Sequence, residues 1–412
     1  MLETHLSSSV TCERLRASAV AEHIDAFADW LHSAGYTALT VKGLLQSLAG
    51  WTDWMRTAGY TAQDLLAGLD ACKAMLAHEA HIPFRRGPNG HSLEAASAFV
   101  RFLRERGVLA LPVPAPSATE RWPLLGEYRS WMRTNRGLTE TSLDVYEGIL
   151  VGLLAALGDD PGAYSAESLR TFVLERAKPH GIERAKSIAV AVRSFLRFLG
   201  ATGRCASGID YAIPGYACWQ LSTVPRYLPL EDIERIIGSC ADDANGRRDR
   251  AVLLLLARLA LRASEVAELR LADIDWRSGS ILVCGKARRQ ALLPLPQEVG
   301  DAILCYLQQG RPPLSVPEVF VTVTAPLHPL TRAAVTHIVR SALRRCAIHA
   351  PINGAHVLRH SAATAMLRQG ASLAGVGAVL RHRSARTTAL YAKVDFDLLS
   401  QIAQPWPEVP PC

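Results

Sequence analysis

The sequence predicts a mainly α-helical, multidomain protein that contains one small antiparallel sheet. Its 412 residues exceed the roughly 250 to 300 residues at which single hydrophobic cores stop growing, so two or three domains are expected. Apolar residues recur at helical spacing through the first ~115 residues. One later stretch, residues 276–294, combines turn signals with short apolar runs typical of a β-hairpin.

Composition and charge limit the classes of function. Hydrophobic residues make up 49% of the chain and charged residues 20%, as in soluble globular proteins. No apolar run approaches the ~20 residues that a membrane helix needs, and the opening MLETHLSSSVTCERLR has no signal-peptide core. We therefore expect a cytoplasmic protein. The net charge of +7 fits a polyanionic partner without proving one.

The cysteines give no sign of a metal site. They are scattered singly, without C-x-x-C or paired Cys/His spacing, so we expect free thiols in a reducing compartment and no zinc.

The N-terminal part of the chain contains an internal echo. Residues 27–38, FADWLHSAGYTA, recur in similar form as residues 51–62, WTDWMRTAGYTA. Each copy is a short amphipathic segment closed by glycine. Because residues 111–116 are a proline-rich linker, the sequence predicts an N-terminal helical domain over residues 1–115.

A β-hairpin is predicted in the second half of the chain. Residues 276–280 form a turn signal, 281–284 a strand, 285–289 a second turn and 291–294 a second strand. Lys286 lies in the second turn, and Lys393 is the only other lysine after residue 227.

The most informative stretch runs from His356 to Tyr391. His356 and Arg359 lie three residues apart in a run with helical apolar spacing, so they share one face of a helix. His382 and Tyr391 follow, nine residues apart, among several arginines. Taken alone, a histidine near a helix start is more often a cap or a surface group, and a lone tyrosine usually packs. The combination places two histidines, an arginine and a tyrosine where they can meet at one phosphate.

This pattern of H-x-x-R, then L-x-H, then tyrosine resembles the tyrosine recombinase (phage integrase) family. The resemblance implies a first catalytic arginine in an apolar helix before a Ser-Glu pair, which is the place of Arg262 before Ser264-Glu265. It also implies a lysine in a hairpin, the place of Lys286. The expected catalytic residues, in chain order, are Arg262, Lys286, His356, Arg359, His382 and Tyr391. We expect His360 to be structural.

Two residues depart from the family pattern, which has glycine at both positions. Ala260 precedes Leu261 and Arg262, and alanine for glycine inside a helix is mild or even stabilising. Arg381 precedes His382, and it would be strained if the backbone there needs a positive φ. The charge of Arg381 could serve a nearby DNA phosphate.

The resemblance also implies a mechanism. Tyr391 attacks the scissile phosphate to give a 3′-phosphotyrosyl link and a free 5′-hydroxyl, while Arg262 and Arg359 neutralise charge on the phosphate. Lys286 protonates the leaving oxygen, and His356 and His382 assist by proton transfer and hydrogen bonding. No metal, ATP or other cofactor is required.

The implied function is a site-specific DNA recombinase that integrates, excises or transposes a mobile element. Two alternatives remain open at this point. One is type IB topoisomerase-like relaxation, and the other is a DNA-binding regulator without chemistry. The complete set of catalytic residues argues against the regulator.

The same resemblance implies a domain organisation. Residues 127–139 and 192–199 resemble the first and last helices of the family's core-binding domain, expected over residues 116–215, with the catalytic domain over 226–412. Residues 1–115 are then expected to be a degenerate second copy of that bundle or an unrelated helical domain. Predicted DNA-backbone contacts are Arg136, Lys186, Arg193, Arg288 and Arg289.

The expected partner is double-stranded DNA. A homo-tetramer on two duplexes is implied, with the helical tail of residues 393–403 docking on a neighbouring protomer. Packing of this tail on its own domain is the alternative. Association with the nucleoid follows from such a substrate. The need for sibling recombinases stays open.

Overall fold

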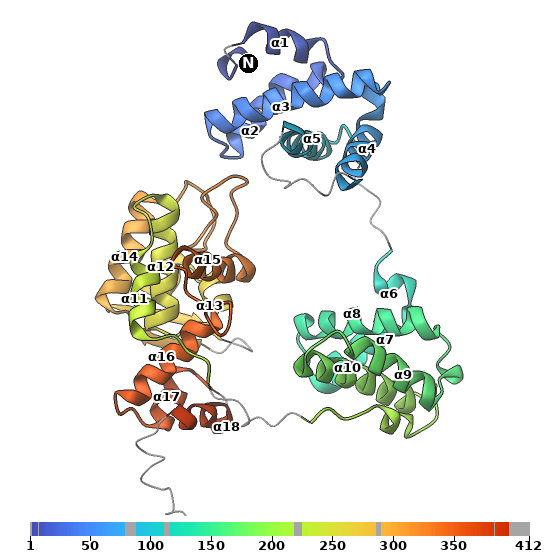
Figure 1. Cartoon of the computed structure of the whole chain (residues 1–412), viewed down its shortest axis with the longest axis vertical. Helices are drawn as coiled ribbons and strands as arrows, with labels where there is room; N and C mark the ends of the chain where they lie inside the picture. Colours follow the sequence, from blue (N-terminus) through green and yellow to red (C-terminus); the bar gives the residue numbers. More distant parts are fainter. Residues whose placement is uncertain are drawn as a thin grey trace, which may run out of the picture. The chain divides into compact units, whose positions relative to one another are not determined.

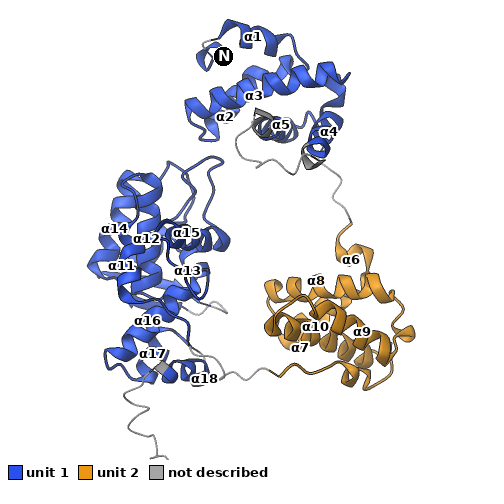
Figure 2. Cartoon of the chain, in the orientation of Figure 1, with its two compact units in different colours: residues 1–110, 223–412 blue, residues 111–222 orange. Residues whose placement is uncertain are grey.

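The computed structural model describes residues 2–6, 8–78, 88–110, 116–217, 225–285, 290–382 and 384–394. They form helices joined by short connections and one small sheet (Figure 1). Contacts between Cα atoms divide the chain into one unit of residues 111–222 and another of residues 1–110 and 223–412 (Figure 2). The predicted fold class, mainly α and multidomain with a small antiparallel sheet, is confirmed.

The N-terminal bundle is built on one core of buried apolar side chains, Trp51, Phe27, Phe99 and Phe102 among them. Its α-helices are α1 (Ser9–Arg16), α2 (Ile24–Ser33), α3 (Ala38–Thr57), α4 (Leu65–His78) and α5 (Pro88–Glu105).

A second bundle lies between residues 118 and 212 and has a core of its own, which includes Tyr128, Phe195 and Leu199. Its α-helices are α6 (Ala118–Arg121), α7 (Pro123–Arg136), α8 (Glu140–Leu157), α9 (Ala166–Ala177) and α10 (Ile182–Ala201).

The two similar segments, residues 27–38 and 51–62, share the same backbone geometry where their helices end. α2 and α3 each end before a glycine in the left-handed conformation, Gly35 with φ +86° and Gly59 with φ +81°. The next amide then bonds back over the helix end, Tyr36 N to Leu31 O at 3.1 Å and Tyr60 N to Met55 O at 2.8 Å. This is a Schellman ending, which glycine favours because it has no Cβ.

One arrangement of aromatic rings occurs in both bundles, between α2 and α5 in the first and between α7 and α10 in the second. In the N-terminal bundle, Phe27 meets Phe99 edge to face with ring centroids 5.1 Å apart, and Trp30 lies 5.8 Å from Phe102 at 54°. The second bundle repeats the edge-to-face pair at 5.3 Å and the tryptophan pair at 5.8 Å and 54°. The residues that do so are Tyr128, Trp131, Phe195 and Phe198.

The C-terminal part of the chain contains the sheet and the remaining helices. The sheet has three antiparallel strands in the order β1-β2-β3. In the register of β2 and β3, Ile281 pairs with Leu293. The elements are α11 (Leu230–Gly238), α12 (Ala244–Arg258), α13 (Ala263–Ala267), β1 (Ile274–Asp275), β2 (Ser280–Cys284), β3 (Gln290–Pro294), α14 (Gln297–Gln309), α15 (Arg332–Arg345), α16 (His356–Arg368), α17 (Leu373–Val379), α18 (Ala385–Thr388) and the 3₁₀ helix η8 (Ala389–Val394).

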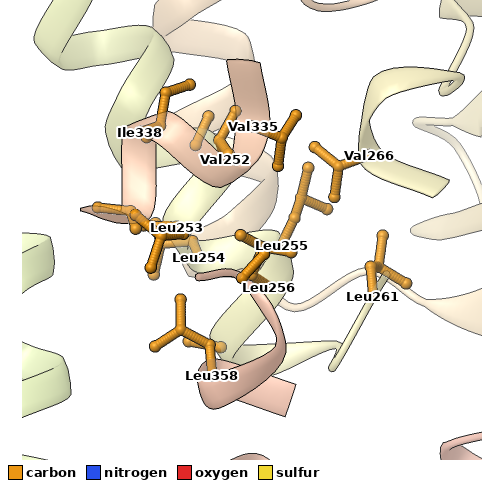
Figure 3. Packing of buried hydrophobic residues seen from close by; sticks show 14 of the residues in the cluster. Val252, Leu253, Leu254, Leu255, Leu256, Leu261, Val266, Val335, Ile338 and Leu358 are labelled. Atoms are coloured by element: carbon orange, nitrogen blue, oxygen red, sulfur yellow. The ribbon is translucent and has the colours of Figure 1, made fainter. Parts of the chain in front are cut away.

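The α12 helix is the centre of this core. Its residues from Ala251 to Leu256 are all fully buried. Because these six consecutive residues are apolar on every side of the helix, other elements must cover this part of it on every side. Val335 and Ile338 of α15 and Leu358 of α16 pack in the same cluster (Figure 3).

One expectation for this region is wrong. Arg262 and Ala260 do not lie inside an apolar helix, because α12 ends at Arg258 and Ala260 has φ +49°. The left-handed turn reverses the chain so that Leu261 is buried and Arg262 becomes the N-cap of α13. Alanine at this position therefore carries backbone strain that glycine would not.

Among the residues that the structure describes, no helix combines the length and the apolar character needed to cross a membrane.

Candidate active site

The last elements of the chain enclose Tyr391 in a small apolar cluster. Tyr391 lies in η8 and is only 3% exposed. It packs with Ala363 and Leu367 of α16, with Val376 of α17, and with Ala260. The turn before Arg262 and the C-terminal helices therefore share one core around the tyrosine.

Arg359 holds this region together from inside. It is 2% exposed, and its Nη1 donates to the carbonyl oxygen of Ala260 while its Nη2 donates to that of Leu380. Burial first, and then the charge of Arg262, lowers the pKa of Arg359 to about 10, so the guanidinium stays charged at neutral pH. Two turns far apart in the sequence are fastened to one cation.

Arg262 is held by a buried carboxylate. Glu265, 2% exposed at its side chain, accepts a 2.6 Å hydrogen bond from Arg262 Nη1 and another of 2.8 Å from the Arg262 backbone amide. The same Glu265 accepts from Arg381 Nη2 at 2.6 Å. Glu265 thus links two arginines from different turns.

The backbone at Arg381 is left-handed, with φ +54°, so the condition for strain at this non-glycine residue is met. Arg381 follows α17, and the amide of His382 bonds back to the carbonyl of Gly377 at 3.0 Å, which is a Schellman ending with arginine in the glycine position. The ion pair with Glu265 offsets part of the resulting strain.

Three histidines surround the same region, and all are neutral at pH 7. Burial, followed by the neighbouring His356, lowers the pKa of His360 to about 4. Burial, followed by the charge of Arg359, lowers the pKa of His382 to about 4 and that of His356 below its ordinary value. His382 Nδ1 shares a 2.9 Å hydrogen bond with the hydroxyl of Thr388, which leaves Nε2 for a ligand. The His382 ring stacks on Tyr391 at 6.4 Å between centroids.

The tyrosine hydroxyl has a direct partner. Tyr391 Oη and His360 Nδ1 share a hydrogen bond of 2.8 Å. Burial raises the pKa of Tyr391 to about 12, although Arg359 opposes the rise. The phenol is therefore protonated in the resting protein.

The structure thus gathers five of the predicted catalytic residues, Arg262, His356, Arg359, His382 and Tyr391, around one site through shared hydrogen bonds, ring contacts and charge effects. The predicted Lys286, with Arg288 and Arg289, lies outside the described residues. Within the described residues no group of three or more His, Cys, Asp or Glu side chains is placed to hold a metal ion.

The residues of the second bundle that are predicted to contact DNA differ in exposure and in hydrogen bonding. Arg136 is exposed and Lys186 is half-buried. Arg193 is also half-buried, and its Nη2 donates to the carbonyl of Ile213 at 3.1 Å. Other basic side chains of this bundle are held by its own carboxylates, such as Arg129 by Glu147 at 2.6 Å.

Three residues of the site were not predicted: His360, Glu265 and Thr388. His360 follows His356 by four residues, so helical spacing alone places both rings on one face, and their centroids are 4.4 Å apart. Glu265 was visible as part of the Ser-Glu pair, but its contact with Arg381 spans 116 residues and leaves no local signal.

Comparison with known proteins identifies the family. The sequence pattern of the phage integrase family matches residues 226–397. An integrase/recombinase of Sinorhizobium fredii, y4rA, is 36% identical over 94% of this chain and 95% of its own length. The tyrosine recombinase XerD of Listeria innocua is 27% identical over 66% of this chain and 94% of its own. The chain belongs to the phage integrase family, that is, to the tyrosine recombinases.

Solved structures share the fold. The XerH site-specific recombinase bound to its difH substrate matches with a TM-score of 0.51 at 16% identity, over 74% of this chain and 94% of that one. A lambda integrase (residues 75–356) dimer bound to a COC′ core site matches with a TM-score of 0.52 at 17% identity, over 70% and 98%.

The shared carboxylate makes a first prediction. Glu265→Gln should lower the free energy of unfolding by about 2 to 3 kcal/mol, because it removes the counter-charge of two arginines in a buried network. The measurement is denaturant unfolding of the full chain. Glu268→Gln, an exposed change at the C-cap of the same helix, is the matched control and should cost little. Equal stability of the two variants would contradict the role given to Glu265.

The histidines predict how stability depends on pH. In the unfolded chain they titrate near ~6.5, whereas His360 and His382 titrate at about 4 in the folded protein. The unfolded state therefore binds more protons between these values, and their contribution to stability is complete above pH 6.5 and is lost as pH falls toward 4.

Thermal midpoints between pH 7 and pH 4 measure this effect. Replacing both histidines with asparagine should flatten the slope, while His337→Asn, an exposed change on α15, should leave it as in the unchanged protein. A slope that the double variant does not alter would show that other groups produce it.

Proposed function

We propose that this protein is a site-specific DNA recombinase that cuts and rejoins strands through a 3′-phosphotyrosyl link to Tyr391. The observation that carries the proposal is that the buried Tyr391 lies close enough to Arg359 to feel its charge and has the His382 ring stacked on it. A buried phenol beside fixed cations and neutral imidazoles suits attack on a phosphodiester.

The two arginines bind the scissile phosphate. A guanidinium has five N–H donors, and Arg359 uses one nitrogen on each of two backbone carbonyls, which leaves further donors for the phosphate oxygens. Arg262 is 33% exposed and already fixed by Glu265, so it reaches a ligand without losing its counter-ion. Both stabilise the charge that builds as phosphorus becomes five-coordinate.

The remaining residues handle hydrogen bonds and protons. His382, whose Nδ1 is taken by Thr388, offers Nε2 to a phosphate oxygen. His356 assists proton transfer from the start of α16. Lys286 protonates the 5′-oxygen as the phosphorus–oxygen bond breaks. Because the phosphotyrosyl ester keeps the bond energy, a 5′-hydroxyl from a partner strand reverses the step without ATP.

Double-stranded DNA is the proposed substrate. The second bundle, residues 116–215, and the catalytic domain, residues 226–412, are both proposed to bind it. Arg136, Lys186 and Arg193, together with Arg288 and Arg289 of the hairpin, are the proposed backbone contacts. The DNA-bound XerH and lambda integrase structures support this substrate. Integration, excision or transposition of a mobile element is the corresponding role.

The N-terminal domain, residues 1–115, is proposed to be a degenerate second copy of the core-binding bundle. The repeated aromatic pairs support this, as do the matching N-caps Thr61 and Ser165, each of which begins a helix directly after a tyrosine. Arg193, two residues before Phe195, is not repeated, because Ser97 fills its position in the first copy.

Recombination between two duplexes implies a tetramer, and we propose one homo-tetramer on two DNA molecules, working at the nucleoid. The tail predicted to close the ring lies outside the described residues beyond residue 394. Light scattering of the protein with one and with two duplexes measures the stoichiometry.

Tyr391→Phe is the direct test of the proposed function. The variant keeps the ring and removes the attacking oxygen, so it should bind DNA and form no covalent adduct on denaturing gels. Tyr227→Phe is the matched control, since Tyr227 packs on the same cluster and accepts a hydrogen bond from Arg368 but has no proposed role in chemistry. An adduct that survives in Tyr391→Phe would overturn the assignment.

The role of Lys286 has its own test. Sulfur in place of the bridging 5′-oxygen gives a leaving group that needs little protonation. Lys286→Ala should cleave ordinary DNA roughly 10²- to 10⁴-fold more slowly and the sulfur substrate at nearly the rate of the unchanged protein. Arg262→Ala, the comparison variant, should be slow on both. Equal slowness of Lys286→Ala on both substrates would exclude it as the acid.

A further inference from the structure

His360 occupies a position that the proposed mechanism above does not use. It lies on α16 one turn after His356, and its Nδ1 shares the 2.8 Å hydrogen bond with Tyr391 Oη. This is the hydrogen bond that the described structure gives to the phenol oxygen. Since that oxygen is the proposed reacting atom, a residue hydrogen-bonded to it contacts the reaction directly and does not only support other residues.

The packing fixes this contact. The His360 ring meets His356 edge to face at 4.4 Å and lies 5.5 Å from the Tyr391 ring. His382 also stacks on the tyrosine, but its Nδ1 bonds to Thr388. Of these two imidazoles, His360 is the one that shares a hydrogen bond with the phenol oxygen.

We propose that His360 is a catalytic residue that accepts the proton of Tyr391 during strand cleavage and returns it during ligation. The proposal rests on the function proposed for Tyr391. As the bond from Oη to phosphorus forms, the Oη–H bond breaks and its proton moves to His360 Nδ1. The bond from phosphorus to the 5′-oxygen breaks, and that oxygen takes a proton from Lys286. Ligation runs the same transfers in reverse, so protons and bonds balance.

The charges around His360 agree with this role. Burial raises the pKa of Tyr391 to about 12, so little phenolate exists at neutral pH and the attack needs an acceptor. Burial, followed by His356, Arg359 and His382, lowers the pKa of His360 to about 4, so its ring is neutral and able to accept. A bound phosphodiester brings negative charge beside Arg359 and His382, which favours the imidazolium while the substrate is present.

His360→Asn separates proton transfer from positioning. The Oδ1 atom of asparagine can take the place of Nδ1 as a hydrogen-bond acceptor, but it cannot take up the proton. In single-turnover cleavage of a half-site duplex by the full-length protein, we expect His360→Asn to be roughly 10²- to 10⁴-fold slower. His337→Asn, an exposed histidine change on α15, should cleave at the unchanged rate.

A more acidic nucleophile provides the second arm of the test. Fluorinated tyrosine at position 391 has a lower phenol pKa and depends less on a base, so it should restore much of the rate lost in His360→Asn. It should restore little in Lys286→Ala, whose defect concerns the other oxygen. Cleavage by His360→Asn at the unchanged rate, or a slow variant that the fluorinated tyrosine does not rescue, would overturn the proposal.

Two controls keep the outcomes distinct. DNA binding and the thermal midpoint of His360→Asn show whether it is folded, and His360→Gln serves as a second variant with the same expectation. If the unchanged protein forms no adduct at Tyr391, the proposed function fails. If it forms the adduct and both His360 variants match its rate, only the role of His360 fails.

Discussion

The double hydrogen bond of Arg359 is the constraint on which the site depends. One buried guanidinium donates to the carbonyls of Ala260 and Leu380, and each of these stands within two residues of a proposed catalytic group, Arg262 or His382. Carbonyls buried without a donor would each cost about 1 to 3 kcal/mol. Arginine suits the two carbonyls because its planar fork carries donors on two separate nitrogens, one for each carbonyl. The charge that is proposed to bind phosphate therefore also fixes the geometry of the other groups.

Left-handed turns without glycine are the cost of this arrangement. Ala260 and Arg381 both have positive φ, at φ +49° and +54°, where a Cβ is strained. Arg381 offsets the strain through Glu265, which also holds Arg262. The substitution of glycine by arginine thus adds a contact that glycine cannot make. Arg262 is tied to both turns, by its own position after Ala260 and by the carboxylate it shares with Arg381.

The sequence predicted those parts of the fold that depend on local pattern. Helical spacing and turn signals were enough for the hairpin of β2 and β3 and for α16. The motif spacing gave the residues that meet around Tyr391. What could not be predicted depends on contacts across the chain. The break after Arg258 looked like helix because Leu259, Ala260 and Leu261 are apolar, and only the packing of Leu261 into the core favours the turn. The pairing of Tyr391 with His360 joins α16 to η8 and follows from tertiary packing alone.

In the N-terminal bundle, the core resembles that of the second bundle more than the surface does. The edge-to-face ring pairs of the two bundles have similar centroid distances, 5.1 Å in the first bundle and 5.3 Å in the second. The last helix of each bundle is followed by a left-handed glycine, Gly107 in the first and Gly203 in the second. Interior packing tolerates few changes of volume, whereas surface charges change freely. If the bundle is duplicated as proposed, the copy keeps its core while its phosphate contacts change. Ser97 at the position of Arg193 fits this, because the first copy then lacks a contact that is proposed for the second.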